Sequence, residues 1–137
     1  MILKTYSRIF TSDVNATLAV LRQLVGREPE LREPFQDMEV LTIGDFCVVA
    51  GPAQSIIPFI GAVGPVVVDD LAATKVAIEA CGAEIISPIT NVMTGQNMFS
   101  RTPDGVVIEY VQWTEDVWKK VRSASLPKIA TGSGEAH

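Results

Sequence analysis

The 137-residue chain contains an internal repeat, and this repeat restricts the fold more than any other feature of the sequence. Residues 12–26, SDVNATLAVLRQLVG, resemble residues 69–82, DDLAATKVAIEACG, with Asp13 matching Asp70. Each segment follows a run of β-forming residues. Each also begins with an Asp that can cap a helix and ends with a Gly that can terminate one. The sequence therefore predicts two helices at equivalent places in two similar halves.

Three extended segments follow each predicted helix. They cover residues 30–35, 39–43 and 46–50 in the first half, and residues 83–87, 97–101 and 106–112 in the second half. Gly44-Asp45 predicts a tight hairpin, and the second half has a Pro-Asp-Gly turn within Thr102–Gly105. Each half is therefore predicted to be a βαβββ module.

The predicted fold class is α+β, with two tandem βαβββ modules that form a cupped mixed sheet. The modules span residues 3–51 and 61–113, and a linker with two prolines connects them. A copy of about 60 residues buries too little surface to be stable alone, so we expect both modules to pack as one domain over residues 1–130.

A short C-terminal helix is expected at about residues 114–124. Thr114 can cap its start, acidic residues occupy its first turn and basic residues its end, which is the order that the helix dipole favours. Pro127 should end this helix. The small polar segment 131–137 is expected to be disordered.

Composition excludes several classes of protein. Lys and Arg number 11 against 16 Asp and Glu, a net charge of -5, so nucleic acid is not an expected partner. Cys47 and Cys81 lie in apolar stretches and are expected to be buried thiols. The first ten residues lack the apolar core of a signal peptide. The longest apolar run, Ile56–Val68, is broken by Pro and Gly and is too short to span a bilayer, so we expect a cytoplasmic protein without a membrane partner.

The repeat, together with the ending FSRTPDGVVIEYVQW, resembles the vicinal oxygen chelate superfamily of glyoxalase I, extradiol dioxygenases, methylmalonyl-CoA epimerase and bleomycin-resistance proteins. The motif Phe99–Tyr110 is similar to the family pattern F-x-D-P-D-G-x-x-x-E-L/Y, although Thr102 stands where Asp is common. The resemblance covers residues 3–113 and implies a cupped sheet that is often completed in a dimer. It implies no single function, because the superfamily holds both enzymes and non-enzymes.

The resemblance also implies where a metal would bind in members that use one. Counting from the helix caps and from the hairpin glycines gives the four ligand positions as Tyr6, Val48, Val63 and Glu109. One carboxylate and two valines cannot hold a divalent ion, and the only histidine, His137, lies in the tail. We therefore predict no metal and no cofactor. The nearest analogy is to metal-free members of the bleomycin-resistance type.

Alternation along the strands predicts which side chains line the concave face. Tyr6, Arg8 and Phe10 share this face with Phe46, Val48 and Ala50 and with Val107, Glu109 and Val111. The opposite parity should pack under the helices and comprises Ile9, Cys47, Val49, Val66, Val68, Ile108 and Tyr110. Further walls could come from Phe35, Met38, Phe59, Met93, Met98, Trp113 and Trp118. The candidate ligand-binding residues are Tyr6, Arg8, Phe46, Val48, Val63, Val107, Glu109, Val111 and Trp113.

Structural interpretations of the same residues stay open. Tyr6 and Phe46 could pack within a sheet or an interface, and Trp118 could dock the C-terminal helix. Glu109 could be paired with Arg8. An acidic stretch interleaved with arginines is typical of a solvated face rather than of a surface that attracts cations. Its acidic residues are Glu28, Glu30, Glu33, Asp37 and Glu39.

These residues favour a metal-free binding protein that sequesters an aromatic or peptide natural product, such as an antibiotic, in the pockets of a homodimer. The expected ligand is an uncharged or cationic aromatic molecule. The alternative is an enzyme of the same superfamily (a lyase, isomerase or dioxygenase) that uses Glu109, for example as a general base. A third possibility is an interaction module without a ligand. The sequence identifies neither the ligand nor whether the dimer exchanges modules.

Overall fold

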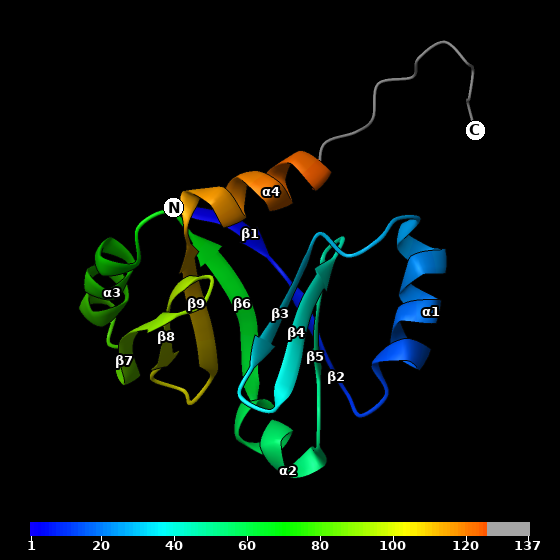
Figure 1. Ribbon diagram of the computed structural model, residues 1–137. Helices are drawn as coiled ribbons and strands as arrows, with labels where there is room; N and C mark the ends of the chain where they lie inside the picture. The colour runs from blue at the N-terminus through cyan, green and yellow to red at the C-terminus, as the bar shows by residue number, and fades with distance from the viewer. Residues whose placement is uncertain (126–137) are drawn as a thin grey trace.

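The computed structural model describes residues 1–125, and two β-sheets form its centre (Figure 1). The five-stranded sheet has the order β1-β6-β9-β8-β7, and the four-stranded sheet has the order β2-β5-β4-β3. The strands of the first sheet are β1 (Ile2–Thr5), β6 (Ala62–Val68), β7 (Glu84–Val92), β8 (Gly95–Arg101) and β9 (Val107–Trp113). Those of the second are β2 (Ser7–Thr11), β3 (Leu31–Phe35), β4 (Met38–Ile43) and β5 (Phe46–Ala50).

Helices flank the two sheets. They are α1 (Val14–Val25), α2 (Ala53–Ile56), the 3-10 helix η1 (Ile57–Phe59), α3 (Leu71–Ala80) and α4 (Glu115–Ser125). Figure 1 shows α1 and α3 on the two outer sides of the molecule, α4 across one end and α2 at the other. The predicted α+β class with two βαβββ modules and a C-terminal helix is confirmed.

The N-terminal run links the two sheets. β1 pairs antiparallel with β6 in the five-stranded sheet, and β2 pairs parallel with β5 in the four-stranded sheet. Between them, the backbone N–H of Tyr6 donates to the carbonyl of Pro65 at 3.2 Å, and that of Ser7 donates to the carbonyl of Asp45 at 2.8 Å. The first extended segment therefore belongs to both modules, which a reading of each repeat by itself does not predict.

The repeated aspartates cap the two helices as predicted. The Asp13 side chain accepts a hydrogen bond from the backbone N–H of Ala16, and Asp70 accepts the equivalent bond from Ala73. At the end of α1, Gly26 has φ 81°, a left-handed conformation that glycine adopts without strain. These local signals set the start of each helix before any packing is considered.

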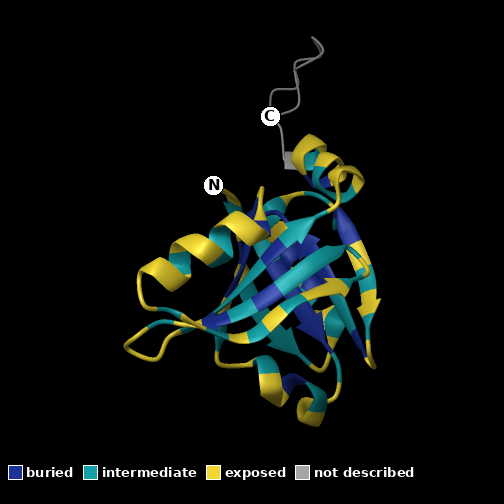
Figure 2. Ribbon diagram, turned by 90° about the vertical axis from the view of Figure 1, so that its left-hand side faces the viewer, coloured by how far each residue is buried: buried dark blue, intermediate teal, exposed yellow. Residues whose placement is uncertain are grey.

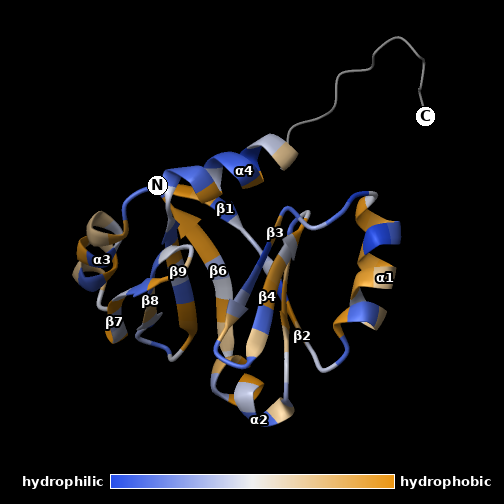
Figure 3. Cartoon of the chain, viewed as in Figure 1, coloured by the Kyte–Doolittle hydropathy of each residue, from blue (hydrophilic) through white to orange (hydrophobic). Residues whose placement is uncertain are grey.

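Each long helix covers the outer face of one sheet. Leu18 and Leu21 of α1 pack on Leu41, Ile43 and Val48, while Leu71 of α3 belongs to a second buried cluster. Figure 2 shows the buried residues concentrated in the strands, with exposed residues along the outer sides of the helices. In Figure 3, α1 carries both apolar and polar segments, and its apolar residues include the exposed Val20 and Leu24 as well as the buried Leu18 and Leu21.

The C-terminal helix begins at Glu115, close to the predicted start. The Thr114 hydroxyl accepts a hydrogen bond from the backbone N–H of Val117, which confirms the predicted cap. Val121 is fully buried, and Arg27 donates to the carbonyl of Ala124 at 2.8 Å, so the second half of α4 is held against the rest of the protein.

Three details differ from the sequence prediction or add to it. The linker contains α2 and η1, for which no helix was predicted, and β7 continues to Val92. Cys81 is exposed rather than buried, whereas Cys47 is buried as predicted. The expectations for Pro127 and for residues 131–137 lie outside the described residues. Within residues 1–125, no helix combines the length and apolar character needed to cross a membrane.

Glu30 is a buried carboxylate at the start of β3. Its residue is 8% exposed, and it forms no ion pair within residues 1–125. Burial raises the pKa of the Glu30 carboxyl above its usual value. The pKa of Tyr6 is also raised, chiefly by burial and secondly by the charge of Glu30. The folded protein therefore holds a proton on Glu30 more tightly than the unfolded chain does.

We expect Glu30→Gln to stabilise the protein at neutral pH. Because the folded pKa is raised, the folded state binds more protons than the unfolded state above the unfolded pKa, so the wild type loses stability as pH rises through this window. Urea unfolding at several pH values from about 4 to 8 should show this loss in the wild type and a smaller one in Glu30→Gln. The exposed Glu28→Gln is the control and should keep the wild-type slope. An unchanged slope in Glu30→Gln would contradict the assignment.

Candidate functional site

A cavity of about 120 Å³ lies between the facing surfaces of the two sheets. Its lining residues come from β2 to β6, η1, β8, β9 and the hairpin that joins β7 to β8. They are Arg8, Leu31, Glu33, Pro34, Phe35, Val40, Cys47, Val49, Phe59, Pro65, Val92, Met93, Thr94, Asn97, Glu109, Val111 and Trp113. An apolar protein cavity of about 150 Å³ holds one benzene molecule, so this cavity can enclose about one aromatic ring.

An ion pair crosses this cavity wall from one sheet to the other. Nη1 of Arg8, on β2, lies 2.8 Å from Oε1 of Glu109, on β9. The two side chains are only 8% and 13% exposed. The interpretation of Glu109 as the partner of Arg8, which the sequence left open, is therefore confirmed.

Further hydrogen bonds fix both members of the pair. Arg8 Nε donates to the carbonyl of Gly64 at 3.2 Å, and Asn97 Nδ2 donates to Oε2 of Glu109 at 3.2 Å. Gly64 has φ 124°, and a Cβ there would lie 2.8 Å from the carbonyl oxygen of Glu109. The close approach of β6 to this pair therefore requires glycine.

Aromatic side chains form the apolar walls. Phe35 and Phe59 meet edge to face with ring centroids 5.8 Å apart. Trp113 packs on Tyr6 with centroids 5.8 Å apart. Only Trp113 of this second pair lines the cavity, so Tyr6 supports the wall from behind. Such contacts fix ring orientation as well as contributing apolar burial.

The predicted site residues divide into two groups. Arg8, Glu109, Val111 and Trp113 line the cavity. The predicted extra walls Phe35, Phe59 and Met93 also line it, whereas Met38, Met98 and Trp118 do not. Tyr6 lies in the core behind Trp113, and Val107 lies near one end of β9, paired with Arg101. Val63 is 54% exposed at the start of β6 and does not line the cavity.

The predicted orientation of β5 is wrong. Phe46 and Val48 pack with α1 on the outer face, while Cys47 and Val49 face the cavity. Strand pairing, and not the turn, explains the error. In both hairpins the first paired residue lies two positions after the glycine, Phe46 after Gly44 and Val107 after Gly105. The pairing of β5 with β2 differs by one residue from the pairing of β9 with β6, and a shift of one residue reverses the faces of a strand.

Strand register identifies the true counterpart of Glu109. Ile9, four residues before the Asp13 cap, pairs with Val48, and the residue four before the Asp70 cap pairs with Tyr110. Val48 therefore corresponds to Tyr110, and Cys47 corresponds to Glu109. Burial raises the pKa of the Cys47 thiol to about 12, so the sulfur is protonated at neutral pH.

The corrected positions do not fit a metal. They are occupied by Tyr6, Cys47, Val63 and Glu109, of which only the last presents an ionised ligand, and the guanidinium of Arg8 already faces that carboxylate. In the described part of the chain, no three His, Cys, Asp or Glu side chains are grouped to hold a metal ion. The prediction of a metal-free protein remains a prediction.

Sequence reasoning named Phe35 of β3 and Met93 of the β7–β8 hairpin as possible walls but missed Leu31, Glu33 and Thr94 beside them. Leu31, Glu33 and Phe35 alternate along β3 on the cavity side, and a period-two reading of that strand would have found them. Met93 and Thr94 reach the cavity only because β7 extends farther than predicted. Asn97 carries no local signal of its role, because its contact with Glu109 depends on the pairing of β8 with β9.

Comparison with known proteins supports the assignment of the fold. No family model and no curated protein matches the chain. An uncharacterized protein from Methanosarcina mazei is 33% identical, with a TM-score of 0.79, covering 84% of this chain and 95% of that chain. Methylmalonyl-CoA epimerase from Mycobacterium tuberculosis is 15% identical, with a TM-score of 0.66, covering 86% and 91% of the two chains. A methylmalonyl-CoA epimerase in complex with methylmalonyl-CoA and NH4+ is 17% identical, with a TM-score of 0.62 and coverage of 84% and 97%.

The fold is that of the vicinal oxygen chelate (glyoxalase/bleomycin resistance) superfamily, as the structural neighbours and the paired βαβββ modules agree. Within this fold, the chain belongs to the same family as the Methanosarcina protein.

We expect Arg8→Met to lower the free energy of unfolding by about 3–5 kcal/mol, because it leaves Glu109 buried without its counter-charge. The double variant Arg8→Met with Glu109→Leu should be more stable than the sum of the two single effects, as measured by urea unfolding. The control is the exposed pair Arg32 and Glu39, for which the same substitutions should change stability by about 0–1 kcal/mol. Additive effects at Arg8 and Glu109 would contradict a coupled pair.

Proposed function

We propose that this protein binds a small aromatic molecule in the cavity between its sheets and sequesters it without a metal ion, in the manner of a drug-resistance protein. The observation that carries this proposal is the apolar, aromatic-walled cavity whose two central charges, Arg8 and Glu109, neutralise each other. Ligand pockets are commonly apolar with a few fixed polar groups. Here those groups are held in place by contacts within the protein.

The size of the cavity limits what can be enclosed. About 120 Å³ accommodates one ring, and a larger natural product, such as a peptide antibiotic, would extend through the opening. Met93 at the β7–β8 hairpin is 70% exposed while also lining the cavity, so its flexible side chain can adapt to such a ligand.

A second candidate function is acid–base catalysis by Glu109. The observation in its favour is that Arg8 and Asn97 hold both carboxylate oxygens in fixed positions on the cavity wall. A fixed carboxylate can transfer a proton to or from a bound molecule. Conversion of a bound ligand by the wild type but not by Glu109→Gln would favour this enzyme over the binding protein.

We also propose that the protein forms a homodimer that completes the binding pockets. The strands β3 and β7 are unpaired edges of their sheets, and such edges are usually covered. Ile57 and Ile60 are 65% and 59% exposed beside Phe59 of the cavity wall. A second copy could cover these apolar side chains and the outer part of a ligand.

Binding is tested with Trp113 as the reporter. The chain has two tryptophans, so the variant Trp118→Phe retains Trp113 as its single tryptophan. Flat aromatic antibiotics or their isolated chromophores should change the fluorescence of this variant until the site is saturated. Phe59→Ala should weaken binding by about 1–3 kcal/mol, because it removes an aromatic wall.

Phe46→Leu is the matched control for that experiment. Phe46 packs against α1 and does not line the cavity, so the affinity should stay at the wild-type value. Aromatic compounds that bind no better than a polar molecule of equal size would overturn the proposed function.

Sedimentation velocity tests the dimer. At concentrations of about 10 µM and above, we expect the sedimenting species to have twice the monomer mass, because typical stable interfaces have affinities in or below this range. Ile57→Glu should shift the species toward the monomer, whereas Val20→Glu on the outer side of α1 should not. A wild-type monomer throughout the range would contradict the dimer.

A further inference from the structure

The carboxylates of the acidic stretch have different surroundings in the folded chain. Glu28 pairs with Arg22, and Glu39 pairs with Arg32. Glu30 is buried at the start of β3. Glu33 has no ion pair or side-chain hydrogen bond within residues 1–125, and it lines the cavity. The prediction of a solvated face is therefore wrong for the buried Glu30, whereas Glu33 is half-buried and lines the cavity.

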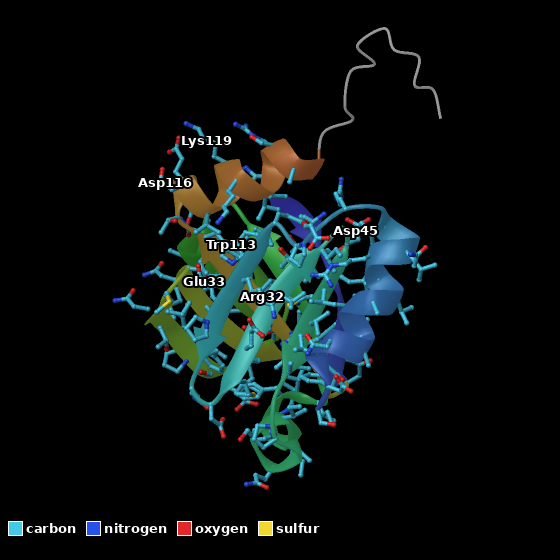
Figure 4. All side chains as sticks on the ribbon, turned by 45° about the vertical axis from the view of Figure 1, so that its right-hand side comes forward. Arg32, Glu33, Asp45, Trp113, Asp116 and Lys119 are labelled. Atoms are coloured by element: carbon cyan, nitrogen blue, oxygen red, sulfur yellow. The ribbon has the colours of Figure 1, made fainter. Side chains whose placement is uncertain are left out.

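Strand geometry directs Glu33 toward the cavity. It lies between Leu31 and Phe35 on alternate positions of β3, and all three line the cavity. Trp113 approaches the same space from β9, and Figure 4 labels Glu33 and Trp113 on these two strands. A carboxylate and an indole ring thus border one apolar space.

The charges around the cavity do not balance. Its charged lining residues are Arg8, Glu33 and Glu109, and the ion pair cancels the first and the last. Glu33 leaves one negative charge beside aromatic walls. Nε and Nη1 of Arg8 are engaged, and its Nη2 has no hydrogen-bond partner in the described structure but is buried, so no Arg8 nitrogen is exposed to an anion in the cavity.

We infer that the ligand is an aromatic amine, whose ring lies among Phe35, Phe59 and Trp113 and whose protonated amino group lies near Glu33. This inference rests on the proposed binding function and specifies the chemical class of the ligand. A cation gains both from the carboxylate and from the electron-rich face of tryptophan. These contributions are larger in an apolar space than in water, because the local dielectric is lower.

The ammonium group could belong to a free aromatic amine or to a lysine side chain of another protein. The cavity favours the aromatic amine. It encloses about one ring and has aromatic walls, which a linear alkyl chain would fill poorly.

The test compares single-ring probes that differ mainly in charge. They are 2-phenylethylamine, which is cationic at neutral pH, 2-phenylethanol, phenylacetate and Nα-acetyl-lysine amide, each titrated against the Trp118→Phe variant by fluorescence and by calorimetry. We expect the cationic amine to bind about three- to tenfold more tightly than the alcohol, and phenylacetate to bind most weakly. Added salt should reduce the advantage of the amine without changing the affinity for the alcohol.

The variant Glu33→Gln should remove most of the preference for the amine over the alcohol while leaving the affinity for the alcohol unchanged. Glu28→Gln, on the same acidic stretch but outside the cavity, should keep the preference. Urea unfolding of both variants checks that each one is folded.

The outcomes separate this inference from the proposed function. If the amine and the alcohol bind equally, or if Glu33→Gln keeps the preference, the inferred amine is wrong while the binding function stands. If the lysine derivative binds as tightly as the aromatic amine, the aromatic part of the inference is wrong. If no probe binds and flat aromatic antibiotics also fail to bind, the proposed function itself fails.

Discussion

The ion pair between Arg8 and Glu109 is the contact on which the remaining arrangement depends, because it joins the four-stranded sheet to the five-stranded sheet at the cavity wall. Removing two charges from water is costly unless each finds its partners. The carbonyl of Gly64 accepts a hydrogen bond from Arg8, and Asn97 donates one to Glu109. Each bond forms only where its strand, β6 or β8, runs close to the ion pair. The pair therefore constrains β6 and β8 as well as the strands that carry it.

The repeat determines most of the architecture, because its signals are local. The aspartate caps and the turn glycines define each helix and hairpin within a few residues, and the alternation of β9 places Glu109 correctly on the inner face. Sequence alone cannot show that the run ending at Thr11 serves two sheets. That division depends on pairing with β5 and β6, which lie far away in the sequence.

The candidate site was predicted only in part, for the same reason. The one-residue error at Val48 arose because the pairing of β5 with β2 differs by one residue from that of β9 with β6, although both strands begin two residues after a turn glycine. The face of a strand follows from its register and not from its distance to a glycine. Glu33 was visible in the sequence, but a charged residue on an edge strand can face either solvent or a cavity. Only the position of the opposite sheet distinguishes the two.

The charge arrangement also explains how this fold can support a cavity without the ligands of a metal site. In this chain a guanidinium, covalently part of β2, provides the positive charge beside Glu109. Its Nε and Nη1 are engaged by the Gly64 carbonyl and by Glu109, and its Nη2 is buried without a hydrogen-bond partner, so the guanidinium serves the contact between the sheets. Under the proposed binding function, groups outside the pair, above all Glu33 and the aromatic walls, set the polarity of the cavity. Glu33 can therefore change without loss of the ion pair. Trp113 serves both purposes, because it lines the cavity and also packs on the core cluster of Tyr6, Cys47, Val67 and Val111.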